Sequence, residues 1–538
     1  MYVSDILIAL LQTAKVASSS AAPIIPPPPQ PEPIDVTELP LPPVSGDSEG
    51  SCTPGINPLR TGCIFFLPDD NHVIARVRYA GAPAVPDPAS IYSGDQIILT
   101  KTDGTSFPDG SSFKCITCGV PESNTKGRTE GLDYPQAFRD GKRILAGTNV
   151  IDCGEFDLAS DNCTPKSTHV YAIRWNTATD GAGEGGPLRE LHQHAYVGRF
   201  VFDPSLTTSL PLAPRYDLTN VSILFADSDR HVPLLKAITV GEFWGFSGTG
   251  KEATYVGYPR ESSSIDVFAV DLVTGDIRRL TSHPEYCDPI DISADDEWIA
   301  IMDMRGTNRQ MFLAGMRDVP PITDLLTATV TSSTRNDGDR RFFQPYLLDR
   351  HGDRGDYYGQ QMNAAGDGSP GSVNDPMWNG TADPKFSFDT TRLVYRQSLV
   401  IAPACGGNNS LPCPDSTEPG GRTQRAMIAR FTSRRLKALE PVVPLSDVTP
   451  WGTPYEPGYV PSPRLLIPGG SYTLRVAVAG SARVDVALNG DGTVVHSIAV
   501  TYDGFTDDGV TFLNGAENVT VGSPVPTLSE LTWFSDLA

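Results

Sequence analysis

The sequence lacks the motifs by which many enzymes are recognised. Its only Gly-x-Ser-x-Gly match, Gly46–Gly50, lies in the Pro-rich N-terminal stretch and not between an apolar strand and a helix, where serine hydrolases carry their nucleophile, and there is no Walker phosphate-binding loop. In peptidases whose catalytic serine domain follows another domain, that motif lies in the C-terminal part of the chain. The residues after position 450 do not contain it. Nucleophilic serine chemistry is therefore not expected.

Positive charge and long apolar runs are also scarce. The chain has 42 Lys and Arg against 64 Asp and Glu, which gives a net charge of −22. Such a protein repels nucleic acid and anionic lipid, and no apolar run reaches the length of a membrane-spanning helix. We expect no nucleic-acid partner and no membrane anchor, while the oligomeric state stays open.

Long helices are disfavoured, because 50 Gly and 48 Pro interrupt short apolar runs. The clearest pattern spans residues 264–314, in which two pairs of apolar strands are each joined by a turn. We interpret it as one four-stranded blade of a β-propeller. A single blade cannot bury both of its faces, so several copies are expected.

The pattern of an apolar or aromatic residue, a turn with Asp or Gly and a second strand recurs along the chain. The turns lie near positions 69, 140, 203, 249, 295, 349 and 389. One such turn is weak evidence, but the series predicts an all-β fold with a seven-bladed β-propeller over residues 51–445.

Residues 446–538 have a different sequence pattern, in which strands of alternating apolar and polar residues flank the hairpin turn at Asn489–Gly492. They predict a small β-sandwich-like C-terminal domain, and a single outer strand that closes the propeller is the alternative. At the other end, residues 1–22 resemble a signal peptide. Residues 23–50 are rich in Pro and are expected to be a linker outside any core, so that folded structure begins near Ser51.

Cysteines and sequons agree with secretion, which makes the mature protein extracellular. Eight cysteines fall into pairs close in sequence, as expected for disulfides, and Cys287 is left as a buried thiol; the pairs are Cys52/Cys63, Cys115/Cys118, Cys153/Cys163 and Cys405/Cys413. A zinc or redox role for Cys115 and Cys118 is the alternative. Predicted N-glycosylation sites are Asn162, Asn220, Asn379, Asn408 and Asn518.

Polar residues precede many of the repeated turns, where the innermost strand of a blade would begin. Among them Glu242 and Asp288 are candidate catalytic carboxylates on adjacent blades, or else they satisfy buried backbone amides. Candidate substrate-binding residues are Arg139, His194, Arg199, Gln344 and Lys385. His192 and His194 could share a metal, but we interpret them as solvated and predict neither a metal nor a cofactor.

The blade pattern of residues 264–314 resembles the TolB-type, WD40-like blade. The N-terminal third also resembles a family, the fungal secreted saponin hydrolases. The segments that carry this resemblance are ELPLPPV at 38–44, Cys52, INP at 56–58, TGCI at 61–64, GAPAVPDPASIY at 81–92 and KCITCGVP at 114–121.

The resemblance implies an extracellular β-glucuronidase-like glycosidase that releases the glucuronate-linked sugar chain of triterpenoid saponins. Glycosidic hydrolysis needs one carboxylic acid and one carboxylate, for which Glu242 as acid and Asp288 are the candidates. The C6 carboxylate of a glucuronate also needs a cation, for which Arg139, Arg199, Lys385 and His194 are candidates. Two other functions stay open: a uronate lyase with a metal held by His192, His194 and Gln344, and a propeller without enzymatic activity that binds a partner.

Overall fold

The structure is a computed structural model that describes most, but not all, of the chain. It covers residues 25–41, 64–80, 93–129, 131–175, 195–204, 213–224, 241–257, 266–311, 342–400, 415–418, 421–439, 441–442, 444–455, 469–474, 478–490, 495–506, 509–522 and 530–538, with positions 314, 319, 320, 322, 323, 326 and 492. Some strand positions, among them Glu242, are described without their side chains. Apart from a one-turn 3₁₀ helix at Glu122–Asn124, the described elements are strands. No described helix is long and apolar enough to cross a membrane.

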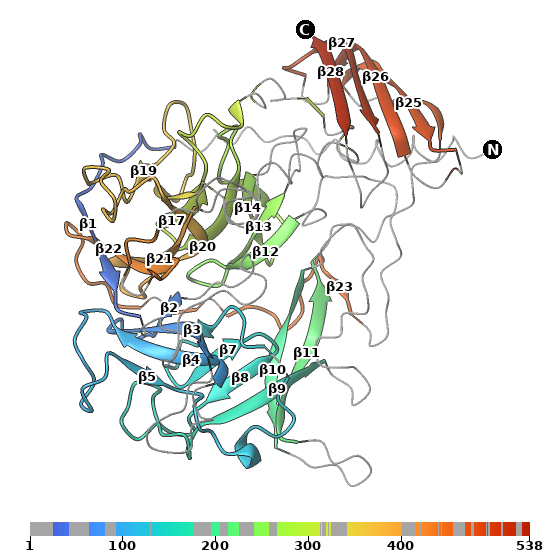
Figure 1. The fold of residues 1–538 in the computed structure, drawn as a ribbon. Helices are drawn as coiled ribbons and strands as arrows, with labels where there is room; N and C mark the ends of the chain where they lie inside the picture. The colour runs from blue at the N-terminus through green and yellow to red at the C-terminus, as the bar shows by residue number, and fades with distance from the viewer. Residues whose placement is uncertain are drawn as a thin grey trace.

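Antiparallel sheets form the blades of a β-propeller (Figure 1). Four of the blades are separate four-stranded sheets, while the second and third belong to one seven-stranded sheet that the parallel pair β9/β11 joins. The first blade is β2 (Ile64–Phe66), β3 (His72–Ala80), β4 (Ser93–Lys101) and β5 (Phe113–Cys115); the second is β6 (Gln136–Ala137), β7 (Arg143–Ala146), β8 (Asn149–Asp152) and β9 (His169–Trp175). The fourth is β12 (Gly241–Phe246), β13 (Glu252–Gly257), β14 (Asp266–Asp271) and β15 (Ile277–Arg279); the fifth is β16 (Cys287–Ile292), β17 (Trp298–Asp303), β18 (Gln344–Asp349) and β19 (Gln360–Gln361).

The third and sixth blades recruit strands from distant parts of the chain. In the third, β10 (Tyr196–Asp203) pairs with β11 (Arg215–Ile223), and β11 pairs in turn with β23 (Thr453–Pro454). In the sixth, the sheet order is β20 (Trp378–Phe386), β21 (Arg392–Leu399), β22 (Gln424–Phe431) and β1 (Ile34–Leu39). Strands from near both ends of the propeller sequence therefore complete blades formed elsewhere in the chain.

Strand β1 corrects the expectation of a linker over residues 23–50. All six residues of β1 pair antiparallel with β22, from Ile34 opposite Phe431 to Leu39 opposite Ala426. Leu39 and Leu41 are buried in a core shared with the first blade. Folded structure therefore begins before Ser51, because the alternating residues of β1 add an outer strand to the last blade and close the ring.

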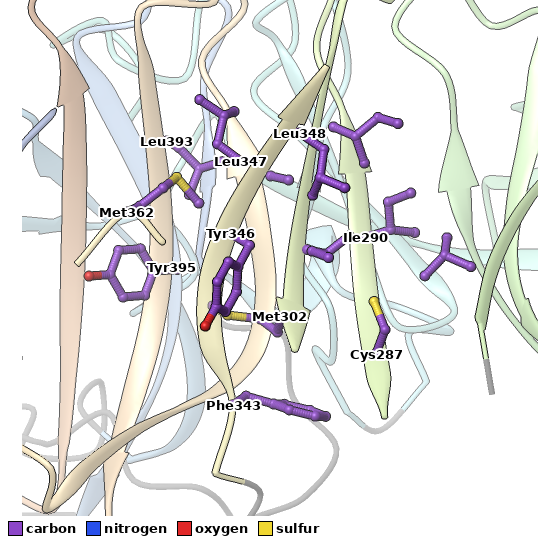
Figure 2. Close-up of a cluster of buried hydrophobic side chains, with 14 of the residues drawn as sticks. Cys287, Ile290, Met302, Phe343, Tyr346, Leu347, Leu348, Met362, Leu393 and Tyr395 are labelled. Atoms are coloured by element: carbon purple, nitrogen blue, oxygen red, sulfur yellow. The ribbon is translucent and has the colours of Figure 1, made fainter. Parts of the chain in front are cut away.

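Buried apolar cores join each blade to the next. One core holds residues of the fourth, fifth and sixth blades. Figure 2 shows part of it and labels Cys287, Ile290 and Met302 of the fifth blade and Leu393 and Tyr395 of the sixth. Further cores join the sixth blade to the first, the first to the second, the second to the third and the third to the fourth. The sheets therefore form a closed ring in which every blade buries both faces.

The described residues form six such blades, so the predicted number of seven is not confirmed. The turn near Asp349 joins β18 to β19, the third and fourth strands of the fifth blade, and does not begin a new blade. The segment 264–314 also spans a blade boundary: β14 and β15 end the fourth blade, and β16 and β17 begin the fifth. Every hairpin in a blade has a similar turn, so the turn alone does not reveal which strands it joins.

The C-terminal domain is a five-stranded antiparallel meander, which lies to one side of the propeller in Figure 1. Its strands are β24 (Gly470–Leu474), β25 (Ala479–Leu488), β26 (Val495–Thr506), β27 (Leu513–Val521) and β28 (Leu531–Leu537). Val319, Ile322 and Leu326 pack against its apolar face. The predicted boundary at 445/446 falls too early, because Trp451 donates a hydrogen bond to the carbonyl of Asp271 (3.0 Å) and β23 belongs to the third blade.

Candidate functional site

The first strand of each blade runs in the same direction along the propeller. β9 and β11, the last strand of one blade and the second strand of the next, pair in parallel, as this arrangement requires. The hairpin turns that follow first strands also meet: Asp70 accepts hydrogen bonds from the backbone N–H groups of Phe388 (2.6 Å) and Asp389 (3.0 Å), and Thr249 donates to Asp296. We call this the turn end of the propeller and the opposite end, where the first strands begin, the mouth.

Glu242 and Asp288 occupy equivalent positions at the mouth. Each is the second residue of a six-residue first strand, β12 and β16, and these two strands contact each other. Asp288 is 2% exposed, and the Tyr286 hydroxyl donates a hydrogen bond to its Oδ2. The two positions therefore lie on the first strands of neighbouring blades, as predicted, while the side chain of Glu242 lies outside the described part.

A buried charge network holds the loop that precedes Asp288. Arg305 bridges Asp303 (2.6 Å) and Asp353 (2.8 Å), and all three side chains are almost fully buried. Burial raises the pKa of Asp303 to about 6, although Arg305 opposes this shift. Next to this network, Glu285 accepts hydrogen bonds from the Thr307 hydroxyl (2.8 Å) and the Gln310 N–H (3.2 Å), which fixes the residue before Tyr286.

Arg396 is a buried cation at the same level that the sequence predictions did not select. It lies on β21 opposite Ala382 of β20, and β20 contacts β16. Its side chain is 2% exposed, and its Nε donates to the Thr381 hydroxyl (3.2 Å). Asp383, also buried, lies two residues from Thr381 on the same strand. Sequence spacing places Arg396 near one of the first-strand starts but does not single it out, because it lies on the second strand of its blade.

Lys385 is engaged between blades. Its Nζ lies 3.0 Å from Oδ1 of Asp291 in β16, and Oδ2 of Asp291 accepts the backbone N–H of Phe386 (2.9 Å). Burial raises the pKa of Asp291, and Lys385 counteracts that shift. Lys385 therefore joins the fifth and sixth blades, as a structural cation would.

Three further predicted binding residues lie away from the first-strand starts. Arg139 follows β6 at the turn end, where its guanidinium donates to the carbonyl of Gly248 and burial lowers its pKa. Arg199 holds the segment after the sixth blade through Asp447 (3.0 Å) and the carbonyl of Leu445 (2.9 Å). Gln344 begins β18, a third strand, and accepts a hydrogen bond from Asn363 (2.6 Å). The expected ring of first-strand residues therefore does not include Gln344.

The histidines His192 and His194 lie outside the described residues. Among the residues that the structure describes, no group of three or more His, Cys, Asp or Glu side chains is arranged to hold a metal ion. His351, expected to be exposed, is exposed in the turn between β18 and β19.

Two of the predicted disulfides are present, Cys115–Cys118 and Cys153–Cys163. Cys287 is a buried free thiol, as predicted, and burial raises its pKa. Cys52, Cys63, Cys405 and Cys413 lie outside the described residues. Of the sequons, Asn162, Asn220 and Asn518 are exposed, Asn379 is 3% exposed at the start of β20, and Asn408 is not described.

Comparisons with known proteins do not assign a family. No family model matches the chain, and no curated protein matches it. Among solved structures, it is similar to a TolB-type protein from Agrobacterium tumefaciens, with 12% identity and a TM-score of 0.23 over 69% of this chain and 89% of that chain. TolB from Acinetobacter baumannii has 13% identity and a TM-score of 0.28 over 68% and 64%, and Pyrococcus horikoshii acylaminoacyl peptidase has 11% and 0.25 over 64% and 43%. The β-propeller assignment itself rests on the sheets and on the cores between them.

Proposed function

We propose that the protein is an extracellular glycoside hydrolase whose catalytic pair is Glu242 and Asp288. The observation that supports this most strongly is their equivalent position in two contacting first strands at the mouth. Hydrolysis of a glycosidic bond needs two carboxyl groups on opposite sides of that bond, roughly 5.5 Å apart for retention and farther apart for inversion. Neighbouring blades can present such a pair from rigid strands.

In this proposal the longer Glu242 protonates the leaving oxygen, and Asp288 attacks the sugar or activates water. Asp288 suits a positioned role, because it is buried and accepts the Tyr286 hydroxyl, while the Arg305 network supports the loop behind it. Such supporting contacts keep a reacting group in one geometry at little cost during the reaction. The buried Tyr286 also excludes water from one side of the carboxylate.

The substrate class we propose is a glucuronide, with triterpenoid saponins as the first example. A glucuronate carries a C6 carboxylate, which a guanidinium recognises better than an ammonium group does. Arg396 is the candidate that the packing favours, because it lies at the level of the pair on a blade that contacts β16. Lys385, Arg139 and Arg199 are further candidates; Lys385 pairs with Asp291, Arg139 donates to the carbonyl of Gly248, and Arg199 pairs with Asp447.

The proposal is tested by incubating the secreted protein with a glucuronide saponin and identifying the products by mass spectrometry. We expect free sapogenin and an intact sugar chain that together have gained one water. Glu242→Gln and Asp288→Asn should each lower kcat by at least about 10²-fold, the lower end of what acid–base groups contribute. Glu297→Gln is the matched control, because Glu297 is half exposed at the turn end, where it pairs with the exposed Arg350.

The products also decide between the remaining functions. A sugar product lighter by one water would contradict hydrolysis and support a uronate lyase. An unchanged saponin and unchanged simple aryl glucuronides would contradict both enzymes and favour a binding function. Normal turnover in Glu242→Gln or in Asp288→Asn would remove that residue from the catalytic pair.

A further inference from the structure

An exposed aromatic side chain lies on the otherwise polar outer face of the C-terminal sheet. Phe534 of β28 is 62% exposed. On its own strand the neighbours on the same face are Thr532 and Asp536, which are exposed. A single exposed apolar ring is common at protein surfaces, so its meaning depends on what lies beside it.

Directly across the strand pair from Phe534 is a glycosylation sequon. Asn518 of β27 is the residue opposite Phe534, and antiparallel partners place their side chains on the same face about 4.5–5.5 Å apart. The sequon is Asn518-Val519-Thr520, and the Thr520 hydroxyl donates to Oδ1 of Asn518 (3.2 Å). The partner of Asn518 on its other side is Ala499, a small residue that leaves room above the sheet.

The other sequons differ from this arrangement. Among the four that the structure describes, Asn162 lies in a turn and Asn379 is buried opposite Ser398. Asn220 lies at an irregular position of β11, between Thr219, which pairs with Arg199, and Ser222, which pairs with Val197. Asn518 is thus the one described sequon whose partner in the strand register is an aromatic residue.

We propose that Asn518 carries an N-linked glycan whose first sugars lie over the ring of Phe534. The C–H face of a pyranose is apolar, and the face of an aromatic ring attracts such polarised hydrogens. Packing the sugar on the ring removes apolar surface from water on both sides. The inference rests on the secretion in the proposed function, because only a chain that enters the secretory pathway meets the glycosylating enzyme.

The position also gives the glycan a protective role. β28 is the edge strand of the meander, and exposed edge strands tend to pair with other chains. A bulky, hydrated group one strand away from this edge obstructs the approach of a second sheet. The glycan would therefore shield both the ring and the edge.

The test uses the full chain secreted from a eukaryotic host behind the host's own leader. We expect most molecules to carry a glycan on the peptide that contains Asn518, as seen by glycopeptide mass spectrometry. An unmodified Asn518 in a chain glycosylated at another sequon would overturn the inference and leave the proposed hydrolase untouched. A glycan at Asn518 in a protein that does not hydrolyse glucuronides would contradict the proposed hydrolase function and leave the glycan inference standing.

A double-mutant cycle tests the contact with the ring. Asn518→Gln should lower the melting temperature by about 2–4 °C in the parent and by little in a Phe534→Ser background. Phe512→Ser is the matched control, since Phe512 is 51% exposed just before β27 but faces no sequon. An equal loss in the Phe534→Ser and parent backgrounds would show that the glycan does not act through the ring.

Discussion

The two ends of the first strands use carboxylates in different ways. At the turn end, Asp70 accepts hydrogen bonds from two backbone N–H groups of the sixth blade. Asp296 accepts hydrogen bonds from the hydroxyl and the backbone N–H of Thr249 in the fourth blade. One step inward, Asp291 accepts both Lys385 and a backbone N–H. At the mouth, Asp288 instead accepts the hydroxyl of Tyr286, a residue of its own strand's approach. The turn end therefore uses carboxylates to join neighbouring blades, while the hydrogen bond from Tyr286 to Asp288 lies within the approach to a single strand.

The largest effect on stability that we expect from this difference follows the removal of the Lys385 charge. Lys385→Met leaves the carboxylate of Asp291, which is 17% exposed, without its ion-pair partner, and it should lower the free energy of unfolding by about 3 kcal/mol, the lower end for breaking a buried pair. Urea unfolding followed by tryptophan fluorescence measures the change. The double variant Lys385→Met/Asp291→Asn should recover much of the loss. An equally large loss of unfolding free energy in Asp288→Asn would show that the carboxylate at the mouth stabilises the ring as much as those at the turn end do.

Much of the propeller could be predicted from local sequence, because each blade has its own turns and alternating strands. The turn after Phe246 and the turn after Ile292 correctly located two first strands, and with them Glu242 and Asp288. The same kind of turn near Asp349 lies between a third and a fourth strand, so such a turn alone does not mark the start of a blade.

The missing features depend on contacts between distant parts of the chain. The Pro-rich surroundings concealed β1, whose partner β22 lies nearly 400 residues later in the sequence. Arg396 and Arg305 are buried within networks that form only when blades pack or loops return. No spacing along the sequence distinguishes such an arginine from an exposed one.

A second test of the difference between the two ends adds a methyl group at the turn end, where the turns of two blades meet. A Cβ on Gly248 would lie 2.0 Å from the carbonyl oxygen of Ser293 and 2.4 Å from Cα of Ala294. Gly248→Ala should therefore push the fourth and fifth blades apart and cost about 1–3 kcal/mol in urea unfolding. Gly490→Ala is the control, because a Cβ there meets no atom within 4 Å. Equal stability of the two variants would show that these turns are not in tight contact.

The smallest expected effect concerns pH at the strand that closes the ring. Burial and the neighbouring carboxyl of Glu418 raise the pKa of Glu38 in β1 to about 7, although Arg422 and Arg425 oppose the shift. Since the folded pKa lies above the ordinary value, the proton that the two carboxyls share stabilises the fold below about pH 4. This contribution is lost as the pH rises through about 7.

Glu38 is partly exposed, so the effect should be a shallow decline in melting temperature between pH 5 and 8. Glu38→Gln should flatten that decline, because the amide keeps a hydrogen-bond donor at every pH. Glu122→Gln, at an exposed 3₁₀ helix away from this strand, should leave the slope unchanged. If Glu38→Gln melted with the slope of the parent, the closure at β1 would not depend on the shared proton, and pH sensitivity would have to arise at another part of the ring.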